Sequence, residues 1–552
     1  MSFLAKIAES LFHLKADPDN TSLIEKVHDQ IDTHGIDFYR AVVEHLAIPV
    51  SELESTAPRP QAAEAAGGGL QRHTWKNFSG TQTAQPLRYF KPSSLDELAA
   101  IVGRAAAEKC EVRAIGSGHS HSDVAVTSGF MVDTHGLNRV LDLETALLKS
   151  PAEEATLFRV ECGITIRDLN AALDAAGKAL INMGGYDAQT IIGASSTSTH
   201  GSGIDLGPLS SSIVSVVLVA GDGRIYQIEP ADGITDPARF KAEHPEIELK
   251  QDDDWFRSVA VSLGCLGVIY SVTLRVMKKY WLTETRVVSD WDAVRELLRD
   301  GTVLHENRHF EVLINPYEVN GQRTCLITRR DFASPPTEPL VFRPHRQMFA
   351  DLLATLPGTR EALLFLFDEF PHLTPKIIDS AVRQLKDANY VNVSYEIFNI
   401  GGANQINAYS AEIAFPLTTY IAAVDRMLEI ADQTRRLGNL YHTSPFALRF
   451  VKASDSYMSM QFGRDTCMVE IPMITGTIGG KEILQRYETA MYAFGGRPHW
   501  GQINYLTGSH GLIEAMYPKL GAWLSVFKEL NANGMFNSVF TERCGFSESR
   551  FS

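Results

Sequence analysis

Hydrophobic positions near the N-terminus recur with a helical period. Leu23, Ile24, Val27 and Ile31 stand three or four residues apart or next to one another, which places them on one face of a helix. The stretch STAPRPQAAEAAGGGLQ that follows is rich in Pro, Ala and Gly and has no periodicity, as is typical of linkers. We therefore expect residues 1–70 to be a helical N-terminal extension and linker. It would serve either as a brace on the main body or as a partner-binding appendage.

From about residue 85 the pattern alternates between strands and helices. SSLDELAAIVGRAAAEKC predicts a helix that begins behind Ser93 or Ser94, and TIRDLNAALDAAG predicts another that stops at Gly177. EVRAIG and LFRVECGI are short strands, and SIVSVVLVAGDGRIYQIEP predicts two strands joined by an Asp222-Gly223 turn. LGVIYSVTLRV is rich in β-branched residues and closes this α/β region near residue 278. The second half mixes strands such as HFEVLINPY and TCMVEIPMI with helices such as LTTYIAAVDRMLEIADQTRRLG.

Composition excludes several classes of protein. At 552 residues the chain is long enough for two or three domains, and its net charge of −15 argues against a nucleic-acid partner. The six cysteines form no CxxC pair, so we expect neither a disulfide framework nor a metal site. Lys6 and Glu9 interrupt the apolar N-terminus, and no run of some 18 apolar residues occurs. We expect no membrane span and a cytoplasmic location.

Two Gly-rich segments carry the candidate chemistry. In VRAIGSGHSHSDVAVTSG, three small residues precede His119. The Rossmann fingerprint GxGxxG fails, because position 121 is histidine and the following residues favour a turn and strands over a helix. The second segment, MGGYDAQTIIGASSTSTHGSG, is also dense in hydroxyls and glycines. Such segments suit a pyrophosphate and a ribityl chain without positive charge, so we predict a dinucleotide cofactor between two α/β layers.

The first segment, continued as GSGHSHSDVAVTSGFMVDTHGLNRVLDLE, resembles the flavin-attachment segment of the sugar-lactone and alditol oxidases. This group includes gulonolactone and arabinonolactone oxidases and lies within the vanillyl-alcohol-oxidase type of FAD flavoproteins. Further matches follow in order, as ECGITIRDLNAALDAAGKAL, THGSG, SLGCLGVIYSVTLRV, EIAFPL, RPHWGQ and NANGMF. The resemblance runs from about residue 75 to 545.

This resemblance implies an α+β fold. We expect an FAD-binding domain of the vanillyl-alcohol-oxidase/p-cresol methylhydroxylase type, made of two α/β subdomains, over residues 71–280. A substrate domain with an antiparallel sheet and flanking helices is expected over residues 281–495. Residues 496–552 would return to the FAD-binding domain.

The resemblance also implies the residues that bind FAD. His119 matches the histidine that is joined covalently to the flavin 8α-methyl group, and the second Gly-rich segment has no cysteine for a second bond. By the same matching, the other FAD contacts would be Gly116, Ser117, Gly118 and Ser120 at the pyrophosphate, Gly184, Gly193, Ser195, Ser196, His200 and Gly201 along the flavin, Gly264, Gly267, Val268 and Ile269 at the adenine side or pyrophosphate, and His499 beside the flavin or at the domain interface.

The group oxidises a CH–OH carbon of a small alcohol by hydride transfer to flavin N5, and O2 reoxidises the flavin. Its members carry an E-x-R pair, a polar residue on the next strand and a lysine in HW[AG]K. Here Arg449 keeps the arginine position, Ala447 replaces the glutamate, Glu470 stands on the next strand and Gln502 replaces the lysine. We expect Arg449, Glu470 and Gln502 to be the catalytic residues, acting on a sugar-like, polyol or lactone substrate or a bulkier secondary alcohol.

Three alternatives stay open at the sequence level. The protein could be a dehydrogenase that uses another electron acceptor, or a low-turnover flavoprotein that serves as a binding or assembly component through residues 1–70. The small residues Gly193, Ala194 and Ser195 favour an open path for O2, hence an oxidase. A homo-oligomer is a further alternative to a monomer.

Overall fold

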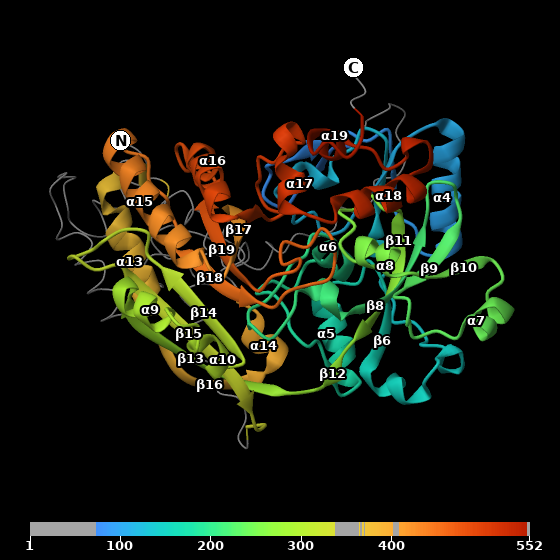
Figure 1. The fold of residues 1–552 in the computed structure, drawn as a ribbon, viewed down its shortest axis with the longest axis horizontal. Coiled ribbons are helices and arrows are strands. Elements are labelled where there is room, and N and C mark those ends of the chain that lie inside the picture. The colour runs from blue at the N-terminus through green and yellow to red at the C-terminus, as the bar shows by residue number, and fades with distance from the viewer. Residues whose placement is uncertain (1–72, 337–363, 365–366, 369, 401–407, 549–552) are drawn as a thin grey trace, which may run out of the picture.

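The computed structural model describes residues 73–336, 364, 367–368, 370–400 and 408–548 (Figure 1). The predicted extension over residues 1–70 lies outside these ranges. Two halves stand side by side, one built around a five-stranded sheet and the other around an eight-stranded sheet. The fold class expected from the sequence, an FAD-binding type of domain followed by an antiparallel sheet domain, is confirmed for the described part of the chain.

The first half contains the predicted alternation of strands and helices. Ser94 caps the first helix by accepting a hydrogen bond from the Glu97 N–H at 3.2 Å. The expected hairpin is present, and Gly223 in its turn has a φ of +84°, which glycine adopts without strain. The elements are β1 (Trp75–Lys76), β2 (Thr83–Ala84), β3 (Arg88–Phe90), α4 (Leu95–Glu108), β4 (Val112–Ile115), β5 (Phe130–Asp133), β6 (Leu157–Glu161), α5 (Ile166–Ala175), β7 (Lys178–Ala179), α6 (Ile191–Ser196), β8 (Ile213–Val219), β9 (Ile225–Glu229), α7 (Pro237–Glu243), β10 (Ile247–Gln251), α8 (Asp253–Val259), β11 (Val268–Arg275) and β12 (Met277–Lys278).

Two sheets organise this half. A parallel sheet has the order β3-β5-β4, and a mixed sheet has the order β10-β9-β8-β11-β6. The carboxyl end of β4 leads directly into the first Gly-rich segment. Loops beyond the carboxyl ends of parallel strands are common ligand-binding positions.

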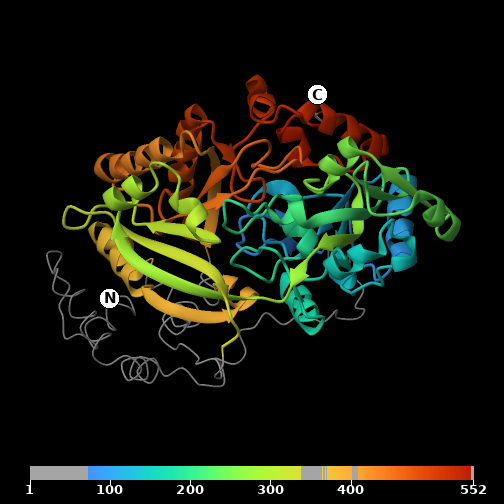
Figure 2. The same cartoon turned by 60° about the horizontal axis from the view of Figure 1, so that its bottom comes forward.

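The second half is an antiparallel sheet in the order β16-β13-β15-β14-β18-β19-β17-β20, seen with its long strands forward in Figure 2. Side chains alternate between its two faces. Phe446, Leu448 and Phe450 pack with the helices in one core, whereas Val451 packs in the core of the first half. The elements are β13 (Trp281–Asp290), α9 (Trp291–Leu297), α10 (Val303–Glu306), β14 (His309–Ile314), β15 (Thr324–Ala333), α13 (Thr374–Gln384), β16 (Asp387–Val393), α14 (Ser394–Phe398), β17 (Ala408–Pro416), α15 (Tyr420–Gly438), β18 (Phe446–Val451), β19 (Thr466–Ile474), α16 (Gly480–Met491) and β20 (Arg497–Pro498).

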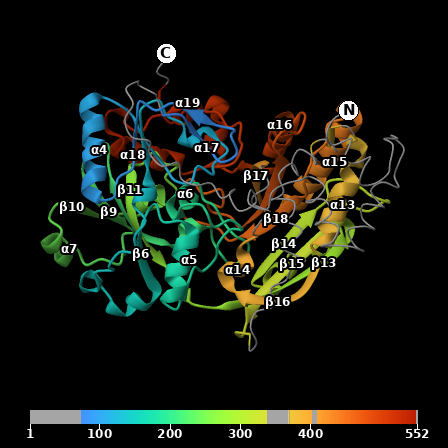
Figure 3. The same ribbon diagram turned by 180° about the vertical axis from the view of Figure 1, so that it is seen from behind.

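The C-terminal segment packs against the first half of the molecule. It contains α17 (Leu512–Met516), α18 (Leu520–Leu530) and α19 (Val539–Arg543), and α18 lies beside α4 in Figures 1 and 3. The Val112 N–H of β4 donates to the Met535 carbonyl at 2.8 Å, and the Gly221 N–H donates to the Leu530 carbonyl at 2.8 Å. None of the helices in the described ranges is both long and apolar enough to cross a bilayer.

Candidate active site

The first Gly-rich loop is held by the small hairpin of β1 and β2. The Phe78 N–H donates to the Gly118 carbonyl at 2.8 Å, and Asn77 Nδ2 donates to the Ser120 carbonyl at 2.9 Å. Gly118 has a φ of +64°, so the loop turns through a left-handed conformation there. The hairpin thus fixes the backbone on both sides of His119. Sequence reasoning did not assign this role to the hairpin, because nothing in the local pattern of residues 75–84 indicates what it contacts.

The His119 imidazole lies between two aromatic rings. Its centroid is 4.5 Å from that of Phe78, in a stacked arrangement, and 4.1 Å from that of Tyr186, in an edge contact. The Nε2 atom is buried and has no hydrogen-bond partner among the described residues. Burial lowers the pKa of His119, so its ring is neutral near pH 7. In contrast, Nδ1 of the nearby His121 is hydrogen-bonded to Ser79 Oγ at 2.8 Å.

The two Gly-rich segments lie against each other. Ser117 Oγ donates to the Ala188 carbonyl at 2.5 Å. A Cβ on Gly116 would stand 2.2 Å from Thr190 Oγ1, the atom that caps α6 by accepting a hydrogen bond from the Gly193 N–H. Glycine at position 116 therefore permits a close approach that no other residue allows. The structure thus brings together the two Gly-rich segments from which the sequence predicted a dinucleotide cofactor site.

Several polar atoms beside these segments fit a flavin. Among the described residues, the buried atoms His119 Nε2, Ser195 Oγ and Gln502 Oε1 have no hydrogen-bond partner. Buried polar atoms in proteins are normally satisfied, and FAD has carbonyl, ring-nitrogen and hydroxyl groups that pair with such atoms. A Cβ on Gly201 would stand 2.4 Å from the Met183 carbonyl, so the chain is packed tightly at that position as well. The residues present therefore fit FAD.

Four further predicted FAD contacts, in β11 and in the turn before it, fall into two kinds of position. Gly264 and Gly267 have φ values of +66° and +92° in the turn before β11, and Arg113 Nη1 donates to the Gly264 carbonyl at 2.8 Å. The Val268 and Ile269 side chains are buried in the apolar core, which leaves only their backbone for a cofactor contact.

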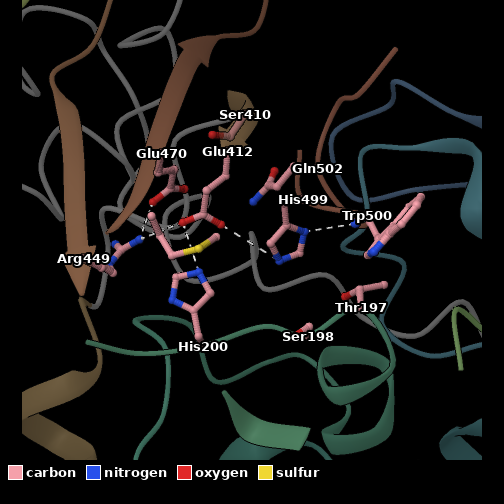
Figure 4. A network of polar contacts seen from close by, with 12 residues as sticks. Thr197, Ser198, His200, Ser410, Glu412, Arg449, Glu470, His499, Trp500 and Gln502 are labelled. Carbon is pink, nitrogen blue, oxygen red and sulfur yellow. Dashed lines mark hydrogen bonds and ion pairs between the residues drawn. The ribbon is translucent and has the colours of Figure 1, made fainter. Parts of the chain in front are cut away.

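A row of polar side chains crosses the sheet face that looks toward the Gly-rich loops (Figure 4). In the register of β18, β19 and β17, Ala447 lies opposite Glu470, and Glu470 lies opposite Glu412. Arg449 Nη1 is 2.7 Å from Glu470 Oε2. The carboxylate that Ala447 lacks is therefore supplied by the neighbouring strand, within hydrogen-bond distance of the same arginine.

Glu412 is the buried carboxylate of this row. Its Oε1 lies 3.2 Å from His200 Nε2 and 3.9 Å from Arg449 Nη1, and its Oε2 lies 3.9 Å from His499 Nε2. Burial raises the pKa of Glu412, but His200, His499 and Arg449 together outweigh it and hold the pKa below its usual value. Sequence reasoning missed this residue. The signal available was its place in the EIAFPL match, on a strand where inward and outward positions alternate.

The charged row continues away from Arg449. Burial raises the pKa of Glu311, yet Arg330 and Arg449 lower it to about 2. Arg330 Nη1 is 2.7 Å from Glu311 Oε1, and Arg330 Nε is 2.7 Å from Glu284 Oε2. Burial lowers the pKa of Arg449, but Glu470, Glu311 and Glu412 raise it well above its usual value. Positively and negatively charged side chains therefore alternate along this sheet face, and each is paired with a neighbour of opposite charge.

The RPHWGQ segment lines the other side of Glu412. His499 Nδ1 accepts a hydrogen bond from the Gly501 N–H at 3.0 Å, and burial lowers the pKa of His499 to about 4. Gln502 points toward Glu412 and His499 in Figure 4. Trp500 is fully buried and donates from Nε1 to the Met458 carbonyl at 2.8 Å, which is a packing role.

Comparisons with known proteins agree with this architecture. A family model described as D-arabinono-1,4-lactone oxidase matches residues 272–544, and one described as FAD binding domain matches residues 86–229. The chain is 29% identical over 469 residues to the L-gulono-1,4-lactone dehydrogenase of Mycobacterium tuberculosis, covering 85% of this chain and 98% of that protein. It is 26% identical to the L-gulonolactone oxidase of Mus musculus, covering 86% and 99% of the two chains. The crystal structure of cholesterol oxidase from B. sterolicum shares the fold, with a TM-score of 0.67 at 12% identity over 88% of this chain and 99% of that one.

Proposed function

Because the chain belongs to the sugar-lactone oxidase group of vanillyl-alcohol-oxidase type flavoproteins, we propose that it oxidises a CH–OH group of a sugar lactone or a related polyol. The protein is an FAD-dependent oxidoreductase. FAD, when bound, accepts the hydride from the substrate carbon, and O2 is the proposed final acceptor. The observation that supports this function best is the Arg449–Glu470 pair on the sheet face opposite the Gly-rich loops.

Arg449 and Glu470 are suited to handling a hydroxyl group. The Arg449 guanidinium donates hydrogen bonds and stabilises negative charge that develops on the substrate oxygen. Glu470 is the more exposed of the two carboxylates beside Arg449, with 23% of its side chain accessible against 5% for Glu412. Glu470 is thus the carboxylate that a substrate hydroxyl would reach first and the proposed acceptor of its proton. The many charged groups on this face favour a polyhydroxyl substrate over a bulky apolar alcohol.

Three residues beside the Gly-rich loops complete the proposed site. Gln502, through its unpaired Oε1, would hydrogen-bond to the flavin or to the substrate. His119 is proposed to carry FAD covalently. Support comes from its neutral ring and from the buried Nε2, which has no hydrogen-bond partner in the described part of the chain. The small residue Ala194, in α6, supports an open path for O2.

A cytoplasmic location is also proposed. All six cysteines are free thiols, and five of them are buried. Proteins with several unpaired cysteines are typical of reducing compartments.

The function is tested by mixing the purified yellow protein, without oxygen, with a panel of aldonolactones and alditols. We expect at least one of them to bleach the visible absorbance of oxidised flavin and admission of O2 to restore it. Glu470→Thr should lower kcat/KM for that substrate by about 10²-fold, because it removes the charged partner of the substrate hydroxyl.

A double variant provides the matched control. Directly opposite Cβ atoms in a sheet stand about 5 Å apart, so Ala447→Glu combined with Glu470→Thr returns a carboxylate to the side of Arg449. This variant should recover most of the lost kcat/KM. Absence of bleaching across the whole panel would contradict the proposed function and favour the low-turnover binding or assembly role.

A further inference from the structure

Two segments that carry predicted site residues are joined to each other at the backbone. The His121 N–H donates to the Gly501 carbonyl at 2.7 Å, and Ser122 Oγ donates to the Trp500 carbonyl at 2.6 Å. The two donor residues closely follow the histidine proposed to carry FAD, and the two acceptor residues directly precede Gln502. The contact between these segments therefore determines how the attachment histidine and Gln502 stand relative to each other.

Asn504 organises the second of these segments. Its Nδ2 donates to the carbonyl oxygens of Gln502 at 3.0 Å, Trp500 at 3.3 Å and His499 at 3.4 Å. One amide group thus gathers the backbone of both predicted site residues, His499 and Gln502. Gln502 Oε1 is buried and has no hydrogen-bond partner among the described residues. The place of this oxygen therefore depends on the backbone that Asn504 holds.

The Arg543 guanidinium, at the end of α19, connects both segments. Its Nε and Nη2 donate to the two carboxylate oxygens of Asp123 at 3.0 and 2.6 Å, and this aspartate begins the one-turn helix that follows the attachment loop. On the other side, Nη1 donates to Asn504 Oδ1 at 3.1 Å and to the Leu506 carbonyl. A planar group with donors at fixed angles can serve two segments at once, whereas a lysine ammonium is a single point charge.

We propose that Arg543 is a positioning residue, which acts through Asn504 and Asp123 to hold Gln502 at a fixed place relative to the attachment histidine. The ion pair is suited to this role because only 24% and 22% of its two side chains are accessible and its geometry is bidentate. This inference rests on the proposed function, since the alignment of flavin and substrate is what the two segments would control. Small errors in such alignment are costly to hydride transfer.

The test compares two variants of the purified flavin-containing protein. Arg543→Lys keeps the charge and loses the planar fork. Asn504→Asp keeps an oxygen for Arg543 and loses the N–H groups that bind three carbonyls. We expect each variant to alter the circular dichroism of the visible flavin bands, which reports how protein groups are placed around the ring. Each should also lower kcat about tenfold for the aldonolactone that bleaches the wild type. KM should stay within about twofold, because Arg449 and Glu470 hold each other on the sheet face.

The double variant distinguishes action through Asn504 from two separate contributions. Arg543→Lys combined with Asn504→Asp should lower kcat no more than about twofold beyond either single variant, whereas independent effects would multiply to about a hundredfold. Arg323→Lys is the matched control. Arg323 also binds a carboxylate and a carbonyl together, those of Asp432 at 2.5 Å and Pro316, but it joins the start of β15 to α15. Its variant should keep the flavin spectrum and kcat of the wild type.

Two results would overturn the proposal. One is a wild-type flavin spectrum and kcat in Arg543→Lys, and the other is a double variant in which the losses multiply. If Arg543→Lys does not fold, Asn504→Asp decides, because an unchanged flavin spectrum in that variant contradicts the proposal equally. The circular dichroism needs no substrate. A panel in which no lactone bleaches the flavin therefore contradicts the proposed function, while the spectra still decide the role of Arg543.

Discussion

At the scale of single residues, position 119 shows how neighbours determine what a histidine can do. His119 and His121 are two residues apart, yet His121 is hydrogen-bonded to Ser79 while His119 Nε2 has no partner in the described ranges. Phe78 and Tyr186 restrict the His119 ring plane without occupying its nitrogens. A neutral, oriented and unpaired imidazole is what formation of a bond to a flavin carbon requires.

Replacing His119 tests the proposed covalent bond. In a denaturing gel under ultraviolet light, the wild-type band should fluoresce with bound flavin, and the His119→Ala band should be dark, because the imidazole proposed to carry the bond is gone. His135→Gln is the matched control. That ring is hydrogen-bonded to Asp133 at 2.6 Å, so its loss should leave the fluorescent band. Fluorescence that persists in His119→Ala would rule out the bond.

At the scale of elements, the site depends on contacts between the end of β4 and the beginning of α6. The two are distant in sequence, but Gly116 lies so close to the Thr190 side chain that there is no space for a methyl group. The β1–β2 hairpin holds the same loop from the other side through Phe78 and Asn77. The shape of the cofactor groove is therefore set by packing between loops and not by either loop alone.

Two glycine substitutions separate close approach from helix propensity. Gly116→Ala should destabilise the protein by about 1–3 kcal/mol, through overpacking against Thr190, and lower its FAD content. Gly103→Ala, in the middle of α4, adds a methyl group with nothing within 4 Å. It should stabilise the protein by about 0.5–1 kcal/mol. Urea unfolding and the flavin absorbance of the purified proteins measure both effects. Equal behaviour of the two variants would contradict the packing argument.

At the scale of the whole molecule, buried titratable groups make stability depend on pH. Burial lowers the pKa of His121, His309 and His442 to about 3 and that of His499 to about 4. The unfolded chain protonates these rings near pH 6.5. The stability that comes from keeping these rings neutral is therefore present above pH 6.5 and is lost as pH falls toward 3. Burial raises the pKa of the Glu488 carboxyl to about 7. The contribution of Glu488 to stability therefore depends on pH in the direction opposite to that of the histidines, because it is lost as pH rises.

Between pH 5 and 6, unfolding should take up about four protons on these histidines and release about one from Glu488. The free energy of unfolding should then fall by up to about 4 kcal/mol per pH unit on acidification, as measured by urea titration at each pH.

A single variant isolates the contribution of Glu488. Its stabilising effect is complete below pH 4.5 and is lost as pH rises through 7, so Glu488→Gln should be more stable than the wild type at pH 8 by up to about 3 kcal/mol and show no such gain at pH 5. Equal stability of the wild type at pH 5 and pH 7 would contradict the histidine argument.

Local patterns in the sequence determined much of this molecule. The Ser94 cap of α4, the Asp222-Gly223 hairpin and the stop of α5 near Gly177 depend on residues a few positions apart, and the structure confirms each of them. The family could also be predicted from local patterns, because its motifs are short and occur in order. The domain boundaries and the role of each site residue stay predictions.

Only the tertiary structure determined which side chains meet. Glu412, Arg449 and His200 come from three distant segments, and their distances depend on the register of β17, β19 and β18 and on how the sheet packs against the Gly-rich loops. Sequence placed Glu470 on a neighbouring strand, but its pairing with Ala447 required the observed register. A strand that slips by one residue turns every side chain to the opposite face, so the sequence alone could place the motifs but not the contacts between them.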